Sequence, residues 1–188
     1  MPQSADRLTF LRAWVANPLR VGAAIPSSAH LAALITRHVH PGIGPVIEFG
    51  PGTGVFTEAL IRRGVMQNEL TLVELGEEFA DILAQRYPGA MIVRADAARL
   101  SMSNLPRPKL HGAAISGLPL VAMPASKVLR ILASAFRLLE PKAGFFQFTY
   151  GWRSPVPESV LRRLDLKAEM IGTEYRNFPP ASVYRVGR

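Results

Sequence analysis

The sequence predicts an α/β protein in which a mostly parallel, doubly wound sheet of seven strands carries helices on both faces and ends in an antiparallel hairpin. Segments with the periodicity of strands and of helices alternate through the middle of the chain. A glycine-rich loop at residues 50–54 lies between the first expected strand and the helix after it. Two extended runs near the end of the sequence are joined by Asn177-Phe178-Pro179-Pro180, a connection typical of a hairpin.

The first 40 residues predict two helices. Residues 6–16 show an amphipathic pattern that Asn17-Pro18 ends, and its apolar side consists of Leu8, Phe10, Leu11, Trp14 and Val15. The second helix begins at Pro26-Ser27-Ser28, where a serine can cap it, and ends at His40-Pro41-Gly42.

Strands and helices then alternate. The expected strands cover residues 46–49, 70–74, 91–94, 112–116 and 145–149, and the expected helices cover 54–63, 77–86 and 126–139. A turn-rich stretch follows, and after it come a short helix around 158–164 and extended runs near 167–176 and 181–186. In such a sheet, ligands bind at the carboxyl ends of the strands, beside the topological switch point.

Composition indicates one folded domain. The chain has 188 residues, of which 48% are hydrophobic, so we expect a single domain over 1–188 whose first 40 residues form a helical segment. The lack of cysteine excludes disulfides, thiolate catalysis and cysteine–metal sites, and His30, His38 and His40 lack the pattern of a metal site. There is no apolar stretch of the ~20 residues that a membrane-spanning helix needs, and no secretory signal, so we expect a cytoplasmic protein.

Charge is distributed unevenly along the chain. Between Glu48 and Asp96 there are eight acidic and four basic residues, whereas the remainder holds six acidic and eighteen basic residues. This surplus predicts a polyanionic partner, either nucleic acid or an anionic membrane. A basic surface that only confers solubility is the alternative.

Three acidic residues stand at successive strand ends. Glu48 closes the first strand, ahead of glycines at positions 50, 52 and 54 whose spacing lets the backbone approach a ligand. Glu74 ends the second strand, 20 residues after Gly54, where a carboxylate can accept two hydrogen bonds from a ribose diol. Asp96 follows the third strand and either accepts a bond from an adenine amino group or caps the next turn. Together they predict a nucleoside-cofactor site; a glycine-rich turn that binds nothing is the alternative.

The loop pattern E-x-G-x-G-x-G resembles the first motif of class I S-adenosylmethionine-dependent methyltransferases and differs from the G-x-G-x-x-G of dinucleotide sites. This resemblance implies S-adenosyl-L-methionine as the cofactor and S-adenosyl-L-homocysteine as its product. The cofactor-binding residues that it implies are Glu48, Gly50, Pro51, Gly52, Thr53, Gly54, Glu74, Leu75, Asp96, Ala97 and Ser116.

The loop Ser116-Gly117-Leu118-Pro119-Leu120 after the fourth strand resembles the N-x-P-Y and N-L-P-Y loops of amino methyltransferases, which hold the target amine. Serine replaces asparagine here, and Leu120 stands where nucleic-acid enzymes carry an aromatic residue. Because leucine cannot stack on a base, an apolar or aliphatic substrate is favoured over adenine.

Over nearly its whole length the chain resembles the bacterial phosphatidylethanolamine N-methyltransferases, or phospholipid N-methyltransferases, most specifically in Ser116–Leu120 and Gln147-Phe148-Thr149-Tyr150-Gly151. The resemblance implies a Rossmann-like class I methyltransferase fold. It also implies up to three methyl transfers to the amine of phosphatidylethanolamine, giving phosphatidylcholine, on the inner face of the cell membrane, with no nucleic acid partner and no metal. The catalytic group that it implies is Ser116, Leu118 and Tyr150. The implied substrate and membrane contacts are Arg7, Phe10, Leu11, Arg12, Trp14, Pro119, Leu120 and Tyr184.

Three alternatives remain open at this point. The helix over 6–16 contacts the membrane, covers the cofactor as a lid, or does both. The enzymic alternative is a ribosomal RNA adenine N6-dimethyltransferase. The non-enzymic alternative is a membrane-binding protein that keeps this fold without activity.

Overall fold

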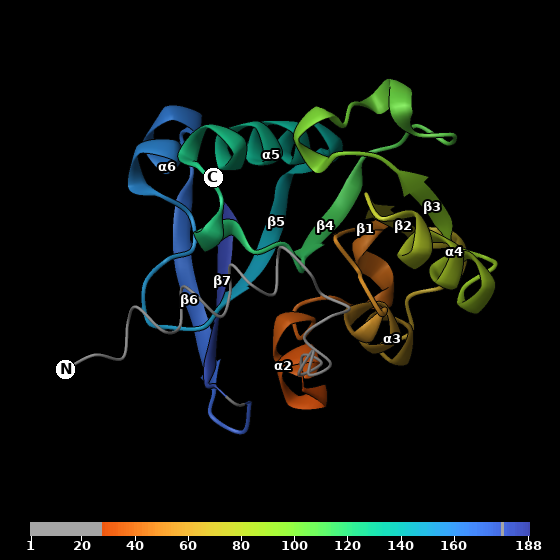
Figure 1. Ribbon diagram of the computed structural model, residues 1–188, viewed down its shortest axis with the longest axis horizontal. Coiled ribbons are helices and arrows are strands. Elements are labelled where there is room, and N and C mark those ends of the chain that lie inside the picture. The colour runs from red at the N-terminus through yellow and green to blue at the C-terminus, as the bar shows by residue number, and fades with distance from the viewer. Residues whose placement is uncertain (1–27, 178) are drawn as a thin grey trace.

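The computed structural model describes residues 28–177 and 179–188 (Figure 1). The helix expected over 6–16 lies outside the described residues, and so do the predicted membrane contacts Arg7, Phe10, Leu11, Arg12 and Trp14.

The described residues contain one seven-stranded sheet, in the order β3-β2-β1-β4-β5-β7-β6. Its parallel strands are β1 (Val46–Phe49), β2 (Leu70–Glu74), β3 (Met91–Arg94), β4 (His111–Ser116) and β5 (Leu139–Thr149). The final hairpin is antiparallel, with β7 (Ala181–Gly187) lying between β5 and β6 (Lys167–Glu174). The predicted fold class is confirmed. The switch point lies between β1 and β4, because the chain order runs outward from β1 in both directions.

Helices cover both faces of this sheet, as Figure 1 shows. One apolar core lies under α5 (Ala125–Leu138) and α6 (Glu158–Leu164) and includes Ile131, Leu132 and Val160. The other lies under α2 (Ala29–Ile35), α3 (Val55–Arg62) and α4 (Glu77–Arg86) and includes Leu31, Leu60 and Leu83. Both faces are therefore shielded from water, which explains why β1 and β4 are buried at every residue.

Two element boundaries differ from the sequence prediction by more than two residues. β5 begins at Leu139, six residues before the predicted start at 145, and directly follows α5. After the buried Leu139, the exposed residues Glu140-Pro141-Lys142 belong to this strand. Their charged and proline side chains are typical of a loop, so the sequence pattern did not indicate a strand here.

The helix predicted to end at His40-Pro41-Gly42 instead ends at Ile35. The Thr36 hydroxyl donates to the Ala32 carbonyl at 2.7 Å, and the Arg63 guanidinium donates to Thr36 Oγ1 at 3.0 Å and to the Ala33 carbonyl at 3.0 Å. Side chains thus bond the Ala32 and Ala33 carbonyls, and the Arg37 N–H bonds the Leu34 carbonyl at 3.3 Å, so these carbonyls are paired although the helix stops early.

The backbone at the amino end of β4 packs directly against the backbone of the segment before β1. The Gly112 N–H donates to the Pro45 carbonyl at 2.8 Å. A Cβ atom at Gly112 would lie 1.6 Å from the Ile43 carbonyl oxygen. Only glycine fits here, because the neighbouring atom belongs to the backbone and has no rotamer by which to withdraw.

Candidate functional site

The glycine loop lies at the carboxyl end of β1, beside the switch point. Gly50, Gly52 and Gly54 have φ values of 65°, 54° and 84°, so each occupies the left-handed region that disfavours other residues. The Gly50 N–H donates to the Val73 carbonyl of β2 at 2.9 Å. The three positive angles explain the alternate glycines of the motif and turn the chain from β1 directly into α3.

Glu74 joins this loop to the end of β2. Its Oε2 accepts the Gly52 N–H at 3.2 Å, and its Oε1 accepts the N–H groups of Leu75 and Gly76, both at 2.9 Å. The predicted ribose-binding carboxylate and the predicted cofactor loop are thus brought together. Leu75, another predicted contact, is 63% exposed and presents an apolar side chain at the same edge.

Glu48 is completely buried beneath the loop. The Thr57 hydroxyl on α3 donates to its Oε2 at 2.6 Å, while its Oε1 has no hydrogen-bond partner among the described residues. Burial raises the pKa of Glu48 to about 7, and the neighbouring charge of Glu74 acts in the same direction, against the hydrogen bond from Thr57. The carboxyl is therefore poised to gain or lose a proton near neutrality.

Asp96 lies after β3 and caps a short 3-10 turn, Ala97–Arg99, by accepting the Ala98 N–H at 3.0 Å. The capping alternative is thus observed in the structure. The loop is tied to β2 because the Ala95 N–H donates to the Glu74 carbonyl at 3.2 Å. Ala97 is buried. Asp96 and Glu74 consequently share one edge of the sheet, on adjacent strands.

The loop after β4 contacts the glycine loop through its backbone. The Gly117 N–H donates to the Phe49 carbonyl at 2.8 Å, and a Cβ atom on Gly117 would lie 2.5 Å from the Gly50 carbonyl oxygen. Ser116 is fully buried, and its hydroxyl accepts the Leu118 N–H at 3.3 Å. The predicted cofactor loop and the predicted acceptor loop are therefore a single contiguous structure.

Sequence reasoning gave no role to Gln147, a buried side chain beside this loop. Its Nε2 donates to the Leu118 carbonyl at 2.8 Å and to the Phe148 carbonyl at 3.0 Å, and its Oε1 has no partner among the described residues. In the sequence, Gln147 stands out only as the first residue of the Gln147–Gly151 motif. Its role becomes apparent from the strand register, which pairs Gln147 with Ser116 and so brings its amide against the loop.

Three other predicted residues have packing or hydrogen-bond partners within the protein. Leu120, predicted to contact substrate or membrane, is 1% exposed and packs in the core under α5, because it begins the 3-10 turn Leu120–Ala122 after Pro119 and points inward. The Tyr184 hydroxyl donates to the Trp152 carbonyl at 2.6 Å, so this side chain ties β7 to the loop after β5. Tyr150 is partly buried, packs edge-to-face on Phe148 with ring centroids 5.5 Å apart, and has a pKa raised by burial.

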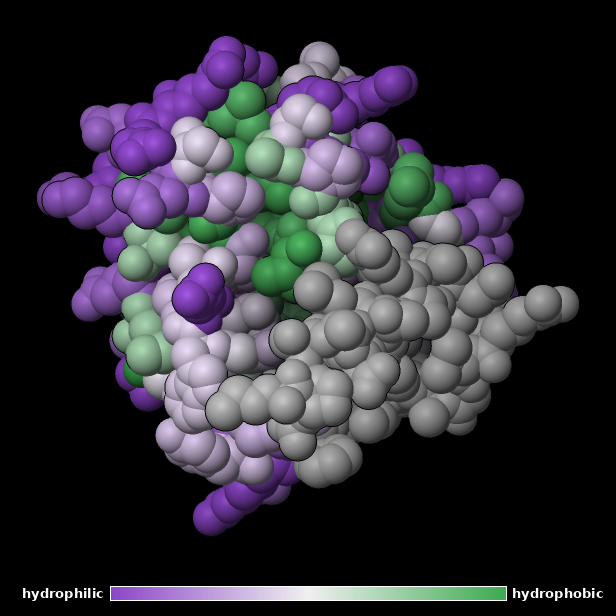
Figure 2. Space-filling view, turned by 60° about the vertical axis from the view of Figure 1, so that its left-hand side comes forward, coloured by the Kyte–Doolittle hydropathy of each residue, from purple (hydrophilic) through white to green (hydrophobic). Residues whose placement is uncertain are grey.

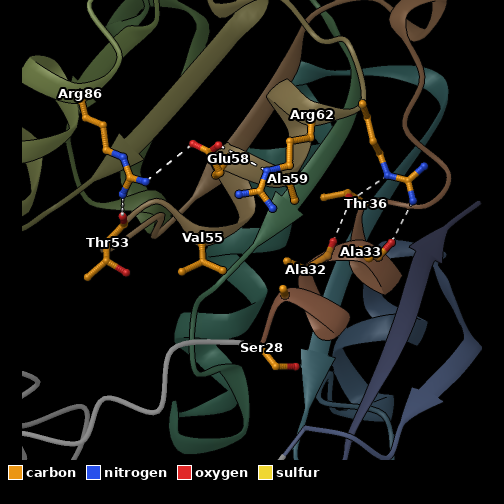
Figure 3. A pocket seen from close by; sticks show the side chains of 12 residues that line it. Ser28, Ala32, Ala33, Thr36, Thr53, Val55, Glu58, Ala59, Arg62 and Arg86 are labelled. Atoms are coloured by element: carbon orange, nitrogen blue, oxygen red, sulfur yellow. Dashed lines mark hydrogen bonds and ion pairs between the residues drawn. The ribbon is translucent and has the colours of Figure 1, made fainter.

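A pocket of about 520 Å³ lies between α2 and α3, next to the glycine loop (Figure 3). Its floor is made of alanines, and its rim carries Arg62 and Arg86 on either side of Glu58, at 3.4 and 3.7 Å. Arg86 also donates to the Thr53 carbonyl at 3.1 Å. The lining residues are Ser28, Ala29, Ala32, Ala33, Thr36, Thr53, Val55, Glu58, Ala59, Arg62, Arg63 and Arg86. Thr53 is the one lining residue that is also a predicted cofactor contact. The sequence prediction gave no site role to the other lining residues.

Over residues 28–177 and 179–188, no group of three or more histidine, aspartate or glutamate side chains is arranged to hold a metal ion.

Comparison with known proteins gives a partial sequence match and a complete structural one. No family model matches the chain. A segment of 63 residues is 41% identical to ribosomal RNA small subunit methyltransferase A of Parabacteroides distasonis; it covers 32% of this chain and only 23% of that protein. The match thus spans about a quarter of the relative's length.

Solved structures match nearly end to end. The Burkholderia thailandensis 1,6-didemethyltoxoflavin-N1-methyltransferase, crystallised with 1,6-didemethyltoxoflavin and S-adenosylhomocysteine, aligns with a TM-score of 0.65 at 17% identity, over 100% of this chain and 91% of that one. A TehB-like S-adenosylmethionine-dependent methyltransferase from Corynebacterium glutamicum aligns with a TM-score of 0.61 at 17% identity, over 96% and 97%.

Proposed function

From the Rossmann-like class I methyltransferase fold of this chain, we propose that it transfers methyl groups from S-adenosylmethionine to the head-group amine of phosphatidylethanolamine. Up to three transfers give phosphatidylcholine, and each leaves S-adenosylhomocysteine. The enzyme works in the cytoplasm, bound peripherally to the inner face of the cell membrane through an anionic lipid surface. It needs neither a metal nor a nucleic acid partner.

The cofactor half of this proposal depends on the placement of Glu74. Its carboxylate lies within hydrogen-bond distance of the glycine loop, 3.2 Å from the Gly52 nitrogen. The ribose hydroxyls of a nucleoside bound at this loop could therefore donate hydrogen bonds to the Glu74 carboxylate. Asp96 stands on the adjacent strand end for the adenine, and exposed Leu75 offers its apolar side chain to the ring. Structural neighbours crystallised with such cofactors support the choice of S-adenosylmethionine.

The acceptor half depends on the loop from Ser116 to Leu120. Methyl transfer is a displacement at a sulfonium carbon, and holding an amine in line at near-attack distance supplies up to ~7–11 kcal/mol. The polar groups of this loop that would orient the amine are the buried Ser116 hydroxyl and the Leu118 carbonyl, which already accepts the Gln147 amide at 2.8 Å and the Leu120 N–H at 2.9 Å. Tyr150 is the candidate third group, since it follows β5 at the same edge.

The amine must be neutral to react. A primary alkylammonium with a pKa of about 10 is almost wholly protonated at neutral pH, so the site must desolvate it or accept its proton.

A lipid substrate is favoured over a nucleobase because the loop has no aromatic side chain at position 120. Leu120, at the position where a base-stacking ring would stand, is aliphatic and buried, so no aromatic face is offered there. The net charge of +8 suits an anionic bilayer. In the part of the chain that the structure describes, no helix has the length and apolar character needed to cross a membrane.

The decisive assay incubates the protein with methyl-labelled S-adenosylmethionine and vesicles containing phosphatidylethanolamine. Thin-layer chromatography of the extracted lipid is expected to show label in the mono-, di- and trimethylated forms. Label that enters small-subunit ribosomal RNA in a parallel reaction, and not the lipid, would contradict the proposal.

That parallel reaction also tests the second candidate function, ribosomal RNA adenine N6-dimethylation. The observation in its favour is the 41% identity over 63 residues with a ribosomal RNA methyltransferase. The non-catalytic alternative predicts instead that titration calorimetry detects no binding of S-adenosylmethionine.

Replacing Glu74 by alanine is expected to weaken S-adenosylmethionine binding roughly 10- to 100-fold, because charge-assisted hydrogen bonds contribute about 1.5–3 kcal/mol each. Titration calorimetry measures the change. The matched control is Glu77→Ala, three residues further on, whose exposed carboxylate pairs with Arg94 at 2.7 Å instead of meeting the loop. Equal affinities for the two variants would show that Glu74 does not contact the cofactor.

A further inference from the structure

Two large aromatic side chains are exposed together at the carboxyl edge of the sheet. Trp152 is 64% exposed and Tyr175 is 68% exposed, and their ring centroids lie 6.1 Å apart. Trp152 follows β5 and Tyr175 follows β6. These strands run the same way on either side of β7, so their carboxyl ends meet at the edge that also carries the glycine loop.

The backbone under each ring is held in place. The Trp152 carbonyl accepts the Tyr184 hydroxyl at 2.6 Å. Beyond Tyr175, the buried Asn177 accepts the Ser28 N–H at 3.1 Å and donates to the Pro179 carbonyl at 2.7 Å. The rings therefore project from anchored loops, which lowers the entropy that a partner must offset on binding.

Each ring has an arginine beside it in sequence. Arg153 and Arg176 are exposed, and neither takes part in an ion pair with another described residue. The nearby Glu174 carboxylate accepts the Arg176 backbone N–H at 2.8 Å. Each ring thus has an exposed cation next to it in the sequence, which is available to an anionic surface.

We propose that Trp152 and Tyr175, flanked by Arg153 and Arg176, form a docking surface that inserts into the head-group region of an anionic phospholipid bilayer. The rings enter the interface between water and hydrocarbon, which indole and phenol side chains prefer, while the arginines bind lipid phosphates. Figure 2 shows the face of the molecule that comes forward on this side, with hydrophobic and hydrophilic groups interspersed over its surface.

A series of contacts leads from this docking surface to the acceptor loop. Tyr184 bonds the Trp152 carbonyl and pairs in the sheet with Gln147, which in turn bonds the Leu118 carbonyl at 2.8 Å. Docking through Trp152 would therefore hold the acceptor loop against the bilayer. In this respect the inference rests on the proposed function and identifies the surface that presents the lipid.

A bilayer fits these side chains better than a nucleic acid. The two rings are tilted by 51° to each other, so they do not form the parallel platform on which successive bases stack. Val121, in the 3-10 turn that follows the acceptor loop, is also 42% exposed and gains from contact with lipid but not from contact with a polyanion.

Tryptophan fluorescence tests the surface directly. The chain has two tryptophans, so Trp14→Phe leaves Trp152 as the single reporter. Vesicles of phosphatidylethanolamine and phosphatidylglycerol are expected to shift its emission to shorter wavelength, and brominated phospholipid is expected to quench it. Unchanged emission while the protein sediments with the vesicles would overturn the proposal, and so would a shift caused by single-stranded RNA but not by vesicles.

A pair of double variants supplies the control. Trp152→Ala with Tyr175→Ala is expected to reduce partitioning onto these vesicles at least about tenfold. Met66→Ala with Leu110→Ala should leave it unchanged, because these side chains, 59% and 42% exposed, precede β2 and β4 at the opposite edge. Equal partitioning of the two double variants would refute the docking surface.

Failure of the proposed function looks different. A wild-type protein that methylates neither vesicle lipid nor dihexanoyl-phosphatidylethanolamine, while its Trp152 emission still responds to vesicles, would disprove the activity and leave the surface intact.

Discussion

Replacing Gly112 by alanine is expected to abolish the native fold, or to lower the free energy of unfolding by at least about 3 kcal/mol. The added Cβ atom would lie 1.6 Å from the Ile43 carbonyl oxygen and 2.7 Å from its carbon. Relief requires β4 to move away from the segment before β1, which breaks the Gly112–Pro45 hydrogen bond and disturbs the pairing with both neighbouring strands. Against a typical total of about 5–15 kcal/mol, such a loss is severe.

Urea denaturation, or the fraction of protein that remains in solution after expression, measures this effect. Gly42→Ala is the matched control, because it lies in the same 3-10 turn as Ile43 and its Cβ atom would meet the nearest neighbour at an ordinary 3.6 Å. Indistinguishable midpoints for the two variants would mean that the contact at Gly112 relaxes at little cost.

Replacing Glu48 by glutamine is expected to change how stability depends on pH. Burial raises the pKa of Glu48 from 4.5 to about 7, so the folded state binds the proton more tightly than the unfolded chain does. The free energy of unfolding of the wild type should therefore fall as pH rises from 4.5 to about 7 and stay level above that. At about 1.36 kcal/mol for each pH unit, the loss amounts to roughly 3 kcal/mol.

Glutamine cannot titrate, and its carbonyl oxygen can still accept the hydrogen bond from Thr57. The comparison is made by urea denaturation of both proteins from pH 4.5 to 8.5, taking the difference between their free energies of unfolding at each pH. His38 and His111, whose pKa values are lowered by burial, titrate in both proteins and drop out of this difference. Parallel profiles would show that Glu48 keeps the pKa of an exposed carboxyl.

Most of the architecture was predictable because local pattern and tertiary environment agree. The strands at 46–49, 70–74 and 91–94 are bounded by glycine, proline or charged residues, and the structure has them at the predicted residues. β5 is the exception. Its first half pairs with β4 through a register irregularity between His111 and Ala113, a long-range contact that leaves no signal in the loop-like Glu140-Pro141-Lys142.

The candidate site was predictable only in part, for a related reason. Residues next to strand ends, such as Glu74 and Asp96, could be placed because parallel strands bring their carboxyl ends to one edge. The direction of individual side chains could not be predicted. Leu120 points inward because it begins a 3-10 turn, and Gln147 meets the loop because of its register with Ser116. The arginine-rimmed pocket was missed because it lies between α2 and α3. The sequence of each helix does not show how the two helices pack against each other.

The contact between Gly117 and Gly50 has a consequence for protein engineering. A Cβ atom on Gly117 would lie 2.5 Å from the Gly50 carbonyl oxygen, so a side chain there displaces the glycine loop. At Gly50 the obstacle is the backbone itself, because its φ of 65° disfavours any other residue. A library intended to change the proposed methyl acceptor should therefore keep both glycines fixed and diversify Val121 to Met123, where side chains are exposed or only partly buried. Under the proposed function, substitutions on this side of the loop could change the acceptor while the glycines that are expected to bind the cofactor stay the same.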